Sequence, residues 1–201
     1  MNYLAHSFLS FGQEQVLVGN FIGDFIKGKT LQDYPEGIQC GILLHREIDA
    51  FTDSHPLVRG GQSYLKPTFG RYSTVITDIY FDYFLAKNWD LYSEQSLEDF
   101  IQQTYRSIQK YRDILPERFL RMFGYMKEQN WLLHYREKEG IQRSLTGLSK
   151  RTRFESKMEL AHLALSEFEA EFELIFFAFF RELSSFAQVK LQKIQASYGP
   201  Y

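Results

Sequence analysis

The stretch from Tyr72 to Lys87 reads YSTVITDIYFDYFLAK, and it decides the class of fold. At about 100° per residue, apolar side chains fall on nearly every side of a helix here. Val75, Phe81 and Leu85 share one side, and Ile76, Tyr80 and Tyr83 share the opposite one. A helix that is apolar all round is normally buried. We therefore predict an all-α fold with this segment at its centre.

The sequence on both sides of this helix carries the same helical rhythm. Pro35–Asp53 begins with a proline that suits a first helical turn, and Ser96 with Asp99 resembles a capping box. Apolar spacing from Leu160 to Phe172 predicts a long C-terminal helix. Alternating strand patterns are absent. We expect a compact multi-helix bundle of roughly seven to nine helices, in a single domain over residues 1–201.

Composition narrows the class of protein further. The chain has 201 residues, 44% of them hydrophobic, so it can build a real core. A formal charge of −2 argues against a nucleic-acid binder. The single cysteine excludes an internal disulfide framework. The N-terminus lacks a signal-peptide pattern and no apolar run approaches membrane-spanning length, so we expect a cytoplasmic protein with no membrane partner.

Two carboxylates interrupt the central helix. Asp78 and Asp82 are four residues apart, on one side of a helix that should be buried. Like charges at this spacing repel, and burying an ionised carboxylate costs several kcal/mol unless it is paired or coordinated. A positive partner must offset that cost. It could be an arginine or a divalent cation.

Further polar residues stand where apolar ones are expected. His45 and Asp49 share a face with Ile38, Ile42 and Ile48, while His6 and Asp24 lie in two apolar segments upstream. Together with the two carboxylates of the central helix, they indicate a mixed metal site. Imidazole and carboxylate ligands suit Mn, Fe or Zn. A metal in such a site activates water near neutral pH, and phosphoester hydrolysis is the reaction that follows most naturally.

Three motifs then resemble a known family. They are Met1-Asn2-Tyr3-Leu4-Ala5-His6, Gly19-Asn20-Phe21-Ile22-Gly23-Asp24 and His45-Arg46-Glu47-Ile48-Asp49, with Asp78-Ile79-Tyr80-Phe81-Asp82 following. This pattern is similar to that of the acyl carrier protein phosphodiesterases. The resemblance implies a helical fold related to the HD phosphohydrolases, a divalent metal with manganese favoured, and acyl carrier protein as substrate. The implied reaction releases 4'-phosphopantetheine from the holo-carrier protein and leaves the apo-carrier protein.

The resemblance also implies roles for residues. The metal centre would be formed by His6, Asp24, His45, Asp49, Asp78 and Asp82. An adjacent His-Asp pair, which names the HD superfamily, is missing because Arg46 follows His45. We therefore expect an HD-like fold with an altered ligand order.

The expected chemistry uses a subset of these side chains. Asp24, His45 and Asp49 would be catalytic, and Arg46 would steady a phosphate oxygen through its planar guanidinium. Downstream, Arg143, Lys150 and Arg151 form a local basic cluster that could bind a phosphate or an acidic partner.

Two other functions are compatible with the sequence. The chain could be a metal phosphohydrolase for a nucleotide or another small phosphoester, with the same site but without a docking face. It could also be a non-catalytic helical interaction module, in which arginine partners balance the buried carboxylates. Metal analysis separates the last reading from the two enzymes.

Overall fold

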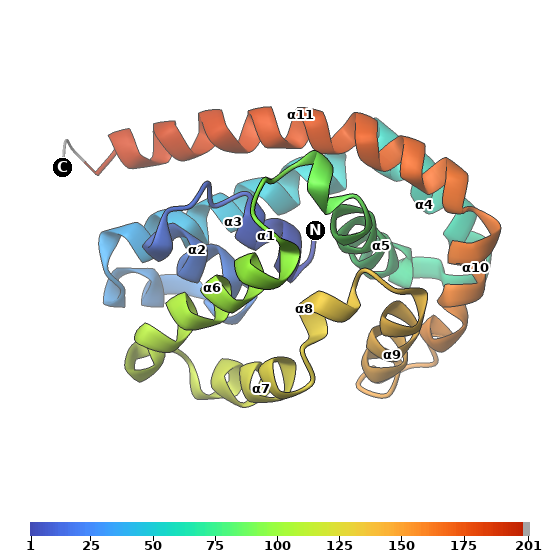
Figure 1. Cartoon of the computed structure of the whole chain (residues 1–201), viewed down its shortest axis with the longest axis horizontal. Helices are drawn as coiled ribbons and strands as arrows, with labels where there is room; N and C mark the ends of the chain where they lie inside the picture. The colour runs from blue at the N-terminus through green and yellow to red at the C-terminus, as the bar shows by residue number, and fades with distance from the viewer. Residues whose placement is uncertain (199–201) are drawn as a thin grey trace.

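A computed structural model describes residues 1–198, the side chain of Lys29 excepted. Over this range the chain is helical and contains no strand, which confirms the all-α prediction (Figure 1). The α-helices are α1 (Tyr3–Phe8), α2 (Glu14–Ile22), α3 (Glu36–Ser54), α4 (Pro56–Phe69), α5 (Ser73–Lys87), α6 (Leu97–Lys110), α7 (Glu117–Glu128), α8 (Trp131–His134), α9 (Lys138–Ser149), α10 (Ala161–Glu167) and α11 (Glu169–Ala196). Short 3-10 turns connect them: η1 (Gly23–Phe25), η2 (Gly28–Asp33), η3 (Gly70–Tyr72), η4 (Trp89–Leu91), η5 (Arg112–Ile114) and η6 (Met158–Leu160).

Helix α5 lies at the centre of the molecule, as its sequence predicts. It packs against α1, α4, α9 and α11. Its aromatic side chains are buried against α11, where the Phe81 and Phe179 rings lie 5.3 Å apart and those of Phe84 and Phe176 lie 5.9 Å apart. Val75 is the exception, with 38% of its surface exposed, because it faces a cavity described below.

Helices α2 and α3 make the closest helix pair. A Cβ atom on Gly19 would lie 2.0 Å from the Ile38 carbonyl oxygen, and one on Gly41 would lie 2.1 Å from that of Val16. Only glycine permits the two backbones to approach this closely. The contact fixes α3 against the N-terminal segments, and α11 covers the other side of α3 (Figure 1).

Several boundaries refine the sequence predictions. Ser96 accepts a hydrogen bond from the Asp99 backbone N–H at 3.1 Å, which confirms the capping interaction. The eleven α-helices within residues 1–198 exceed the expected number because short helices such as α1 and α8 carry little periodicity. The predicted C-terminal helix is interrupted at Phe168, where φ is −112° and ψ is 23°, so α10 and α11 are separate. None of the helices in this range is both long and apolar enough to span a membrane.

A candidate metal centre beside a cavity

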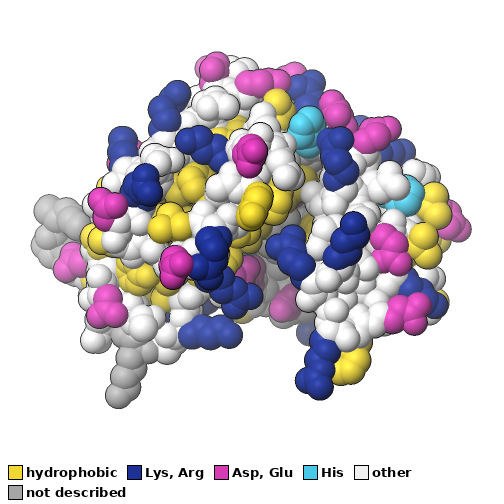
Figure 2. All heavy atoms as spheres, turned by 90° about the horizontal axis from the view of Figure 1, so that it is seen from below, with side chains coloured by type: hydrophobic (Ala, Val, Ile, Leu, Met, Phe, Trp, Pro, Cys, Tyr) yellow, Lys and Arg dark blue, Asp and Glu magenta, His cyan; other side chains and the backbone are white. Residues whose placement is uncertain are grey.

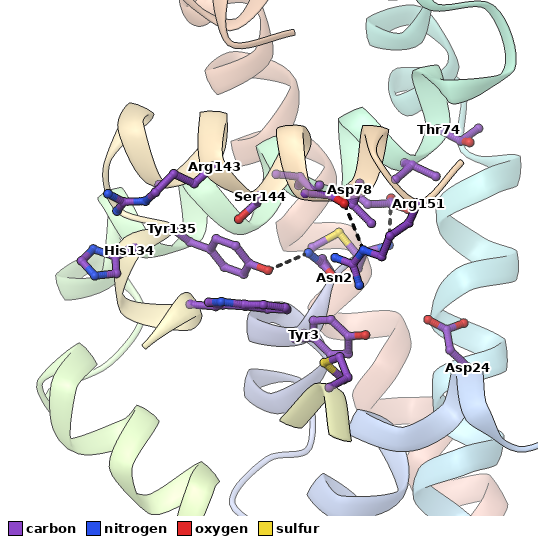
Figure 3. A pocket seen from close by; sticks show the side chains of 18 of the residues that line it. Asn2, Tyr3, Asp24, Thr74, Asp78, His134, Tyr135, Arg143, Ser144 and Arg151 are labelled. Atoms are coloured by element: carbon purple, nitrogen blue, oxygen red, sulfur yellow. Dashed lines mark hydrogen bonds and ion pairs between the residues drawn. The ribbon is translucent and has the colours of Figure 1, made fainter. Parts of the chain in front are cut away.

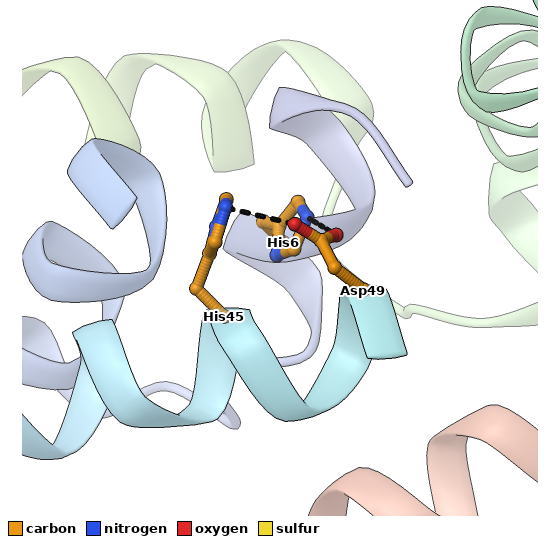
Figure 4. Close-up of side chains that lie close together, drawn as sticks. All are labelled: His6, His45 and Asp49. Atoms are coloured by element: carbon orange, nitrogen blue, oxygen red, sulfur yellow. Dashed lines mark ion pairs between the residues drawn. The ribbon is translucent and has the colours of Figure 1, made fainter. Parts of the chain in front are cut away.

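His6, His45 and Asp49 meet between α1 and α3 (Figure 4). The Nε2 atom of His6 faces Asp49 Oδ1 at 3.2 Å, and that of His45 faces Asp49 Oδ2 at 3.1 Å. The two imidazole rings stack with their centroids 4.1 Å apart. His45 and Asp49 are one helical turn apart, so α3 alone aligns them, whereas His6 is brought in by the packing of α1.

Asn20, fully buried in α2, sets the orientation of both histidines. Its side-chain Oδ1 lies 2.7 Å from His6 Nδ1, and its backbone carbonyl oxygen lies 2.8 Å from His45 Nδ1. The Asn20 amide donates to the His6 carbonyl at 2.7 Å, which identifies Oδ1 as the acceptor. Both Nδ1 atoms therefore carry protons. In the neutral rings the Nε2 atoms are then lone-pair donors, and neither has a hydrogen-bond partner.

The charges in this cluster favour a cation. Burial, together with the neighbouring His45, lowers the pKa of His6 to about 4. Burial also opposes protonation of His45, but contacts with Asp24 and Asp49 outweigh it and raise the pKa of His45 to about 9. Despite burial, both histidines hold the pKa of Asp49 far below its ordinary value. A proton on His45 and a metal ion would compete for the same nitrogen.

The donor set fits a divalent metal. Two imidazole nitrogens and a carboxylate oxygen lie within 4.8 Å of one another. Asp24 Oδ1 approaches His45 Nε2 at 3.4 Å from the exposed side of the cluster. This combination of nitrogen and oxygen ligands is typical of Mn, Fe and Zn sites.

A cavity of about 790 Å³ begins at this cluster (Figure 3). Asp24 and Asp49 line its acidic end, and the side chain of Asp24 is 71% exposed there. Arg143 and Arg151 of the α9 region also line it, and Arg151 reaches toward Tyr3 and Asp78 in this view. Trp131, Tyr135 and Leu148 are among the residues of its apolar wall. The cavity thus joins an acidic end beside the His/Asp cluster, two guanidinium groups and an apolar surface.

The two carboxylates of α5 have other partners. Asp78 accepts a hydrogen bond from the α-amino group of Met1 at 2.9 Å and lines the cavity. Asp82 is fully buried and accepts the backbone N–H groups of Leu4 and Ala5 at 2.8 and 3.1 Å, so it caps α1. The positive partners expected for these carboxylates are therefore an amino group and a helix N-terminus.

Two predicted basic residues lie away from the cavity. Arg46 is exposed and donates to the Ile26 carbonyl at 3.3 Å, because its place in α3 directs it past η1. Lys150 is exposed at the end of α9. Neither residue lines the cavity, whereas Arg143 and Arg151 do.

Two residues of the centre are missing from the sequence prediction. Asn20 is a polar side chain inside an apolar segment, the same signal that indicates His6 and Asp24. Gly23 carries no such signal, yet a Cβ atom there would lie 2.2 Å from the His45 ring. Its missing side chain leaves the space in which His45 stands.

The fold and site define a class: helical proteins with two buried histidines and a half-buried aspartate at one end of a large cavity. A family model described as acyl carrier protein phosphodiesterase matches residues 1–183. A Yersinia enterocolitica protein named acyl carrier protein phosphodiesterase is 34% identical to this chain, over 94% of this chain and 99% of the relative. Proteins of the same name from Yersinia pestis and Photorhabdus laumondii are 31% and 30% identical, each over 94% of this chain and covering 99% and 96% of the relative. This chain belongs to the acyl carrier protein phosphodiesterase family. No solved structure matches it.

Proposed function

We propose that the chain hydrolyses the phosphodiester that joins 4'-phosphopantetheine to a serine of acyl carrier protein, in a reaction that depends on a divalent metal, manganese by expectation. The observation that carries the proposal is the pair of buried Nε2 atoms facing Asp49 at the end of a large cavity. Family membership supplies the substrate class. The products would be apo-carrier protein and 4'-phosphopantetheine.

His6, His45 and Asp49 are the proposed metal ligands, and Asp24 borders the same point. A bound divalent ion would polarise a phosphoryl oxygen and lower the pKa of a coordinated water. The exposed carboxylate of Asp24, whose contact with His45 lowers its pKa, is our candidate proton acceptor for the attacking water. We propose that Asp78 and Asp82 position α1 and therefore His6.

The cavity beyond the metal end would hold the phosphate and the arm. Arg151 is our candidate for binding the non-bridging phosphate oxygens, a role better suited to it than to Arg46, which lies outside the cavity. Its volume of about 790 Å³ is of the size that small-molecule sites have. The apolar wall suits the pantetheine chain, which is mostly uncharged.

The test is incubation of the purified protein with holo-carrier protein and Mn²⁺, followed by mass spectrometry of the carrier. Wild type should remove the prosthetic-group mass. His45→Ala and Asp49→Ala should lose turnover by a factor of at least about a thousand and should also lose bound metal. His162→Ala, on α10, is the matched control and should keep both. A folded His45→Ala protein with full activity contradicts the proposed centre.

A further inference from the structure

In the proposed reaction the scissile phosphodiester joins the arm to a serine of a folded protein. Only the arm and the phosphodiester would then enter the cavity, and the carrier protein would rest on its rim. Seen from below in Figure 2, Lys and Arg side chains gather around a hollow on the face that carries α7, α8 and α9 in Figure 1. The chain as a whole has a formal charge of −2, so this distribution is local.

A second groove, of about 480 Å³, is lined by two segments that are close in sequence to residues of the cavity. Residues 68–72 and 154–157 line the groove, while Thr74 and Val75 on one segment and Arg151 on the other line the cavity. The groove therefore lies next to the cavity and outside the metal centre. Its charged lining residues are Arg71, Lys157 and Glu155.

Two guanidinium groups lie near an exposed aromatic ring at this groove. Phe154 is 57% exposed. The Cζ atoms of Arg71 and Arg153 lie 5.0 and 5.5 Å from its ring centroid. The Tyr72 hydroxyl donates to the Phe154 carbonyl at 3.4 Å and anchors the segment.

This arrangement leaves the cations available to a partner. Within residues 1–198, none of Arg71, Arg153 and Lys157 forms an ion pair, although eight other Lys/Arg–carboxylate pairs do form. Stacking on an aromatic face orients a guanidinium group and leaves N–H groups for carboxylates. One nitrogen of Arg71 donates to the Tyr72 hydroxyl at 3.3 Å, and its other N–H groups remain available. An exposed apolar ring framed by unpaired cations suits an acidic protein surface with an apolar centre.

We propose that Arg71, Phe154 and Arg153 form a docking site for an acidic face of the carrier protein, beside the mouth through which its arm enters. The inference rests on the proposed function and adds a partner surface to it. Phe154 supplies the apolar anchor, and the two arginines supply contacts with carboxylates.

The experiment measures docking without the arm. Fluorescently labelled apo-carrier protein is titrated with wild type, Arg71→Glu and Phe154→Ala at several salt concentrations, and holo-carrier turnover is measured in parallel. We expect Kd for the apo-carrier to rise on the order of tenfold in each variant, with a matching rise in KM for the holo-carrier. Arg71→Glu should also weaken the salt dependence of binding.

Two controls match these changes on α11. Lys193→Glu makes the same charge change near its C-terminal end, and Leu174→Ala removes an apolar side chain that is more exposed than Phe154, at 72%. Both should behave as wild type. If wild type turns over and the groove variants equal their controls in Kd and KM, the docking site is wrong while the proposed function stands. If wild type removes no prosthetic group with any divalent metal, the proposed function fails and the docking inference falls with it. Binding of an RNA oligomer, lost in Arg71→Glu while carrier binding is kept, also overturns the proposal.

Discussion

Asn20 is the residue on which the geometry of both histidines depends. Its side chain accepts from His6 Nδ1, and its backbone carbonyl accepts from His45 Nδ1. Such partners fix the tautomer that leaves Nε2 free for a metal. A substitution of Asn20 removes the side-chain contact with His6 and retains the backbone contact with His45.

We expect Asn20→Ala to weaken Mn²⁺ binding about 10- to 100-fold, because His6 loses the acceptor that orients it. Isothermal titration calorimetry measures the affinity directly. Asn88→Ala is the matched control, since Asn88 bonds the Phe84 carbonyl and Glu173 far from the centre. That variant should lose stability and keep metal affinity. Equal metal affinity in Asn20→Ala and wild type would show that Asn20 does not hold His6.

Residue periodicity could identify which side chains are buried and polar, but not what they contact. His6, His45 and Asp49 stand out by this criterion, and the structure brings them together. The same criterion selects Asp82, whose partners are backbone N–H groups 77 and 78 residues away. Contacts at such separation depend on the packing of α1 against α5, which no local pattern encodes.

At the scale of helices, the geometry of the site depends on how α2 and α3 cross. Asn20 lies on α2, and His45 and Asp49 lie on α3, so their spacing depends on how closely the two backbones pack. Gly41 sits at the crossing.

Gly41→Ala should destabilise the protein by about 1–3 kcal/mol, because the new Cβ would meet the backbone oxygen of Val16. Urea unfolding measures the change. Gly124→Ala makes the same substitution inside α7 where nothing lies within 4 Å, and it should be neutral or stabilising by up to about 1 kcal/mol. If both variants unfold alike, the crossing tolerates a side chain and is not fixed by glycine.

Helix α5 holds α1 through Asp82, and this contact has a pH dependence. Burial raises the pKa of Asp82 to about 7, even though two backbone N–H groups donate to it. The unfolded value is about 3.9. A folded pKa above the unfolded one stabilises the folded state fully below about pH 4, and this contribution is lost as pH rises through about 7.

Asp82→Asn removes this titration and one acceptor oxygen. The free energy of unfolding of wild type, minus that of Asp82→Asn, should therefore fall between about pH 4 and pH 7 and change little at higher pH. Urea unfolding at several pH values measures the difference, and the metal centre, common to both proteins, cancels from it. A difference that stays constant or increases with pH would mean that Asp82 is ionised throughout this range.

The helical class and the central place of α5 could be predicted because they depend on periodicity within one segment. The break at Phe168 could not, since apolar spacing continues across it while the backbone leaves the helical conformation. There the Phe168 ring packs on Tyr64 of α4, with centroids 5.0 Å apart. The relation to the HD phosphohydrolases stays a prediction.

Across the whole molecule, the N-terminal helices supply the candidate metal ligands and the α7–α9 region supplies the opposite wall of the cavity. Asn2 joins the two parts by donating to the Tyr135 hydroxyl at 3.2 Å, across 133 positions of sequence. The sequence groups Arg143, Lys150 and Arg151 as one basic cluster. In three dimensions they separate, because only the two arginines line the cavity.

This separation predicts different kinetics for neighbouring residues. Arg151 lines the cavity and is the proposed phosphate-binding residue. Arg151→Ala should therefore lower kcat/KM for the holo-carrier on the order of a hundredfold, with kcat itself reduced, because a contact to the reacting phosphate is lost. Lys150 is exposed outside the cavity, so Lys150→Ala should act only through long-range charge, with a small rise in KM that disappears at high salt. Steady-state kinetics at low and high ionic strength distinguishes the two effects.

Arg151→Lys is the matched variant, since it keeps the charge and loses the planar bidentate group. It should recover only part of kcat. If Arg151→Ala and Lys150→Ala have the same salt-sensitive effect on KM and leave kcat alone, Arg151 belongs to the electrostatic rim and the phosphate must bind elsewhere in the cavity.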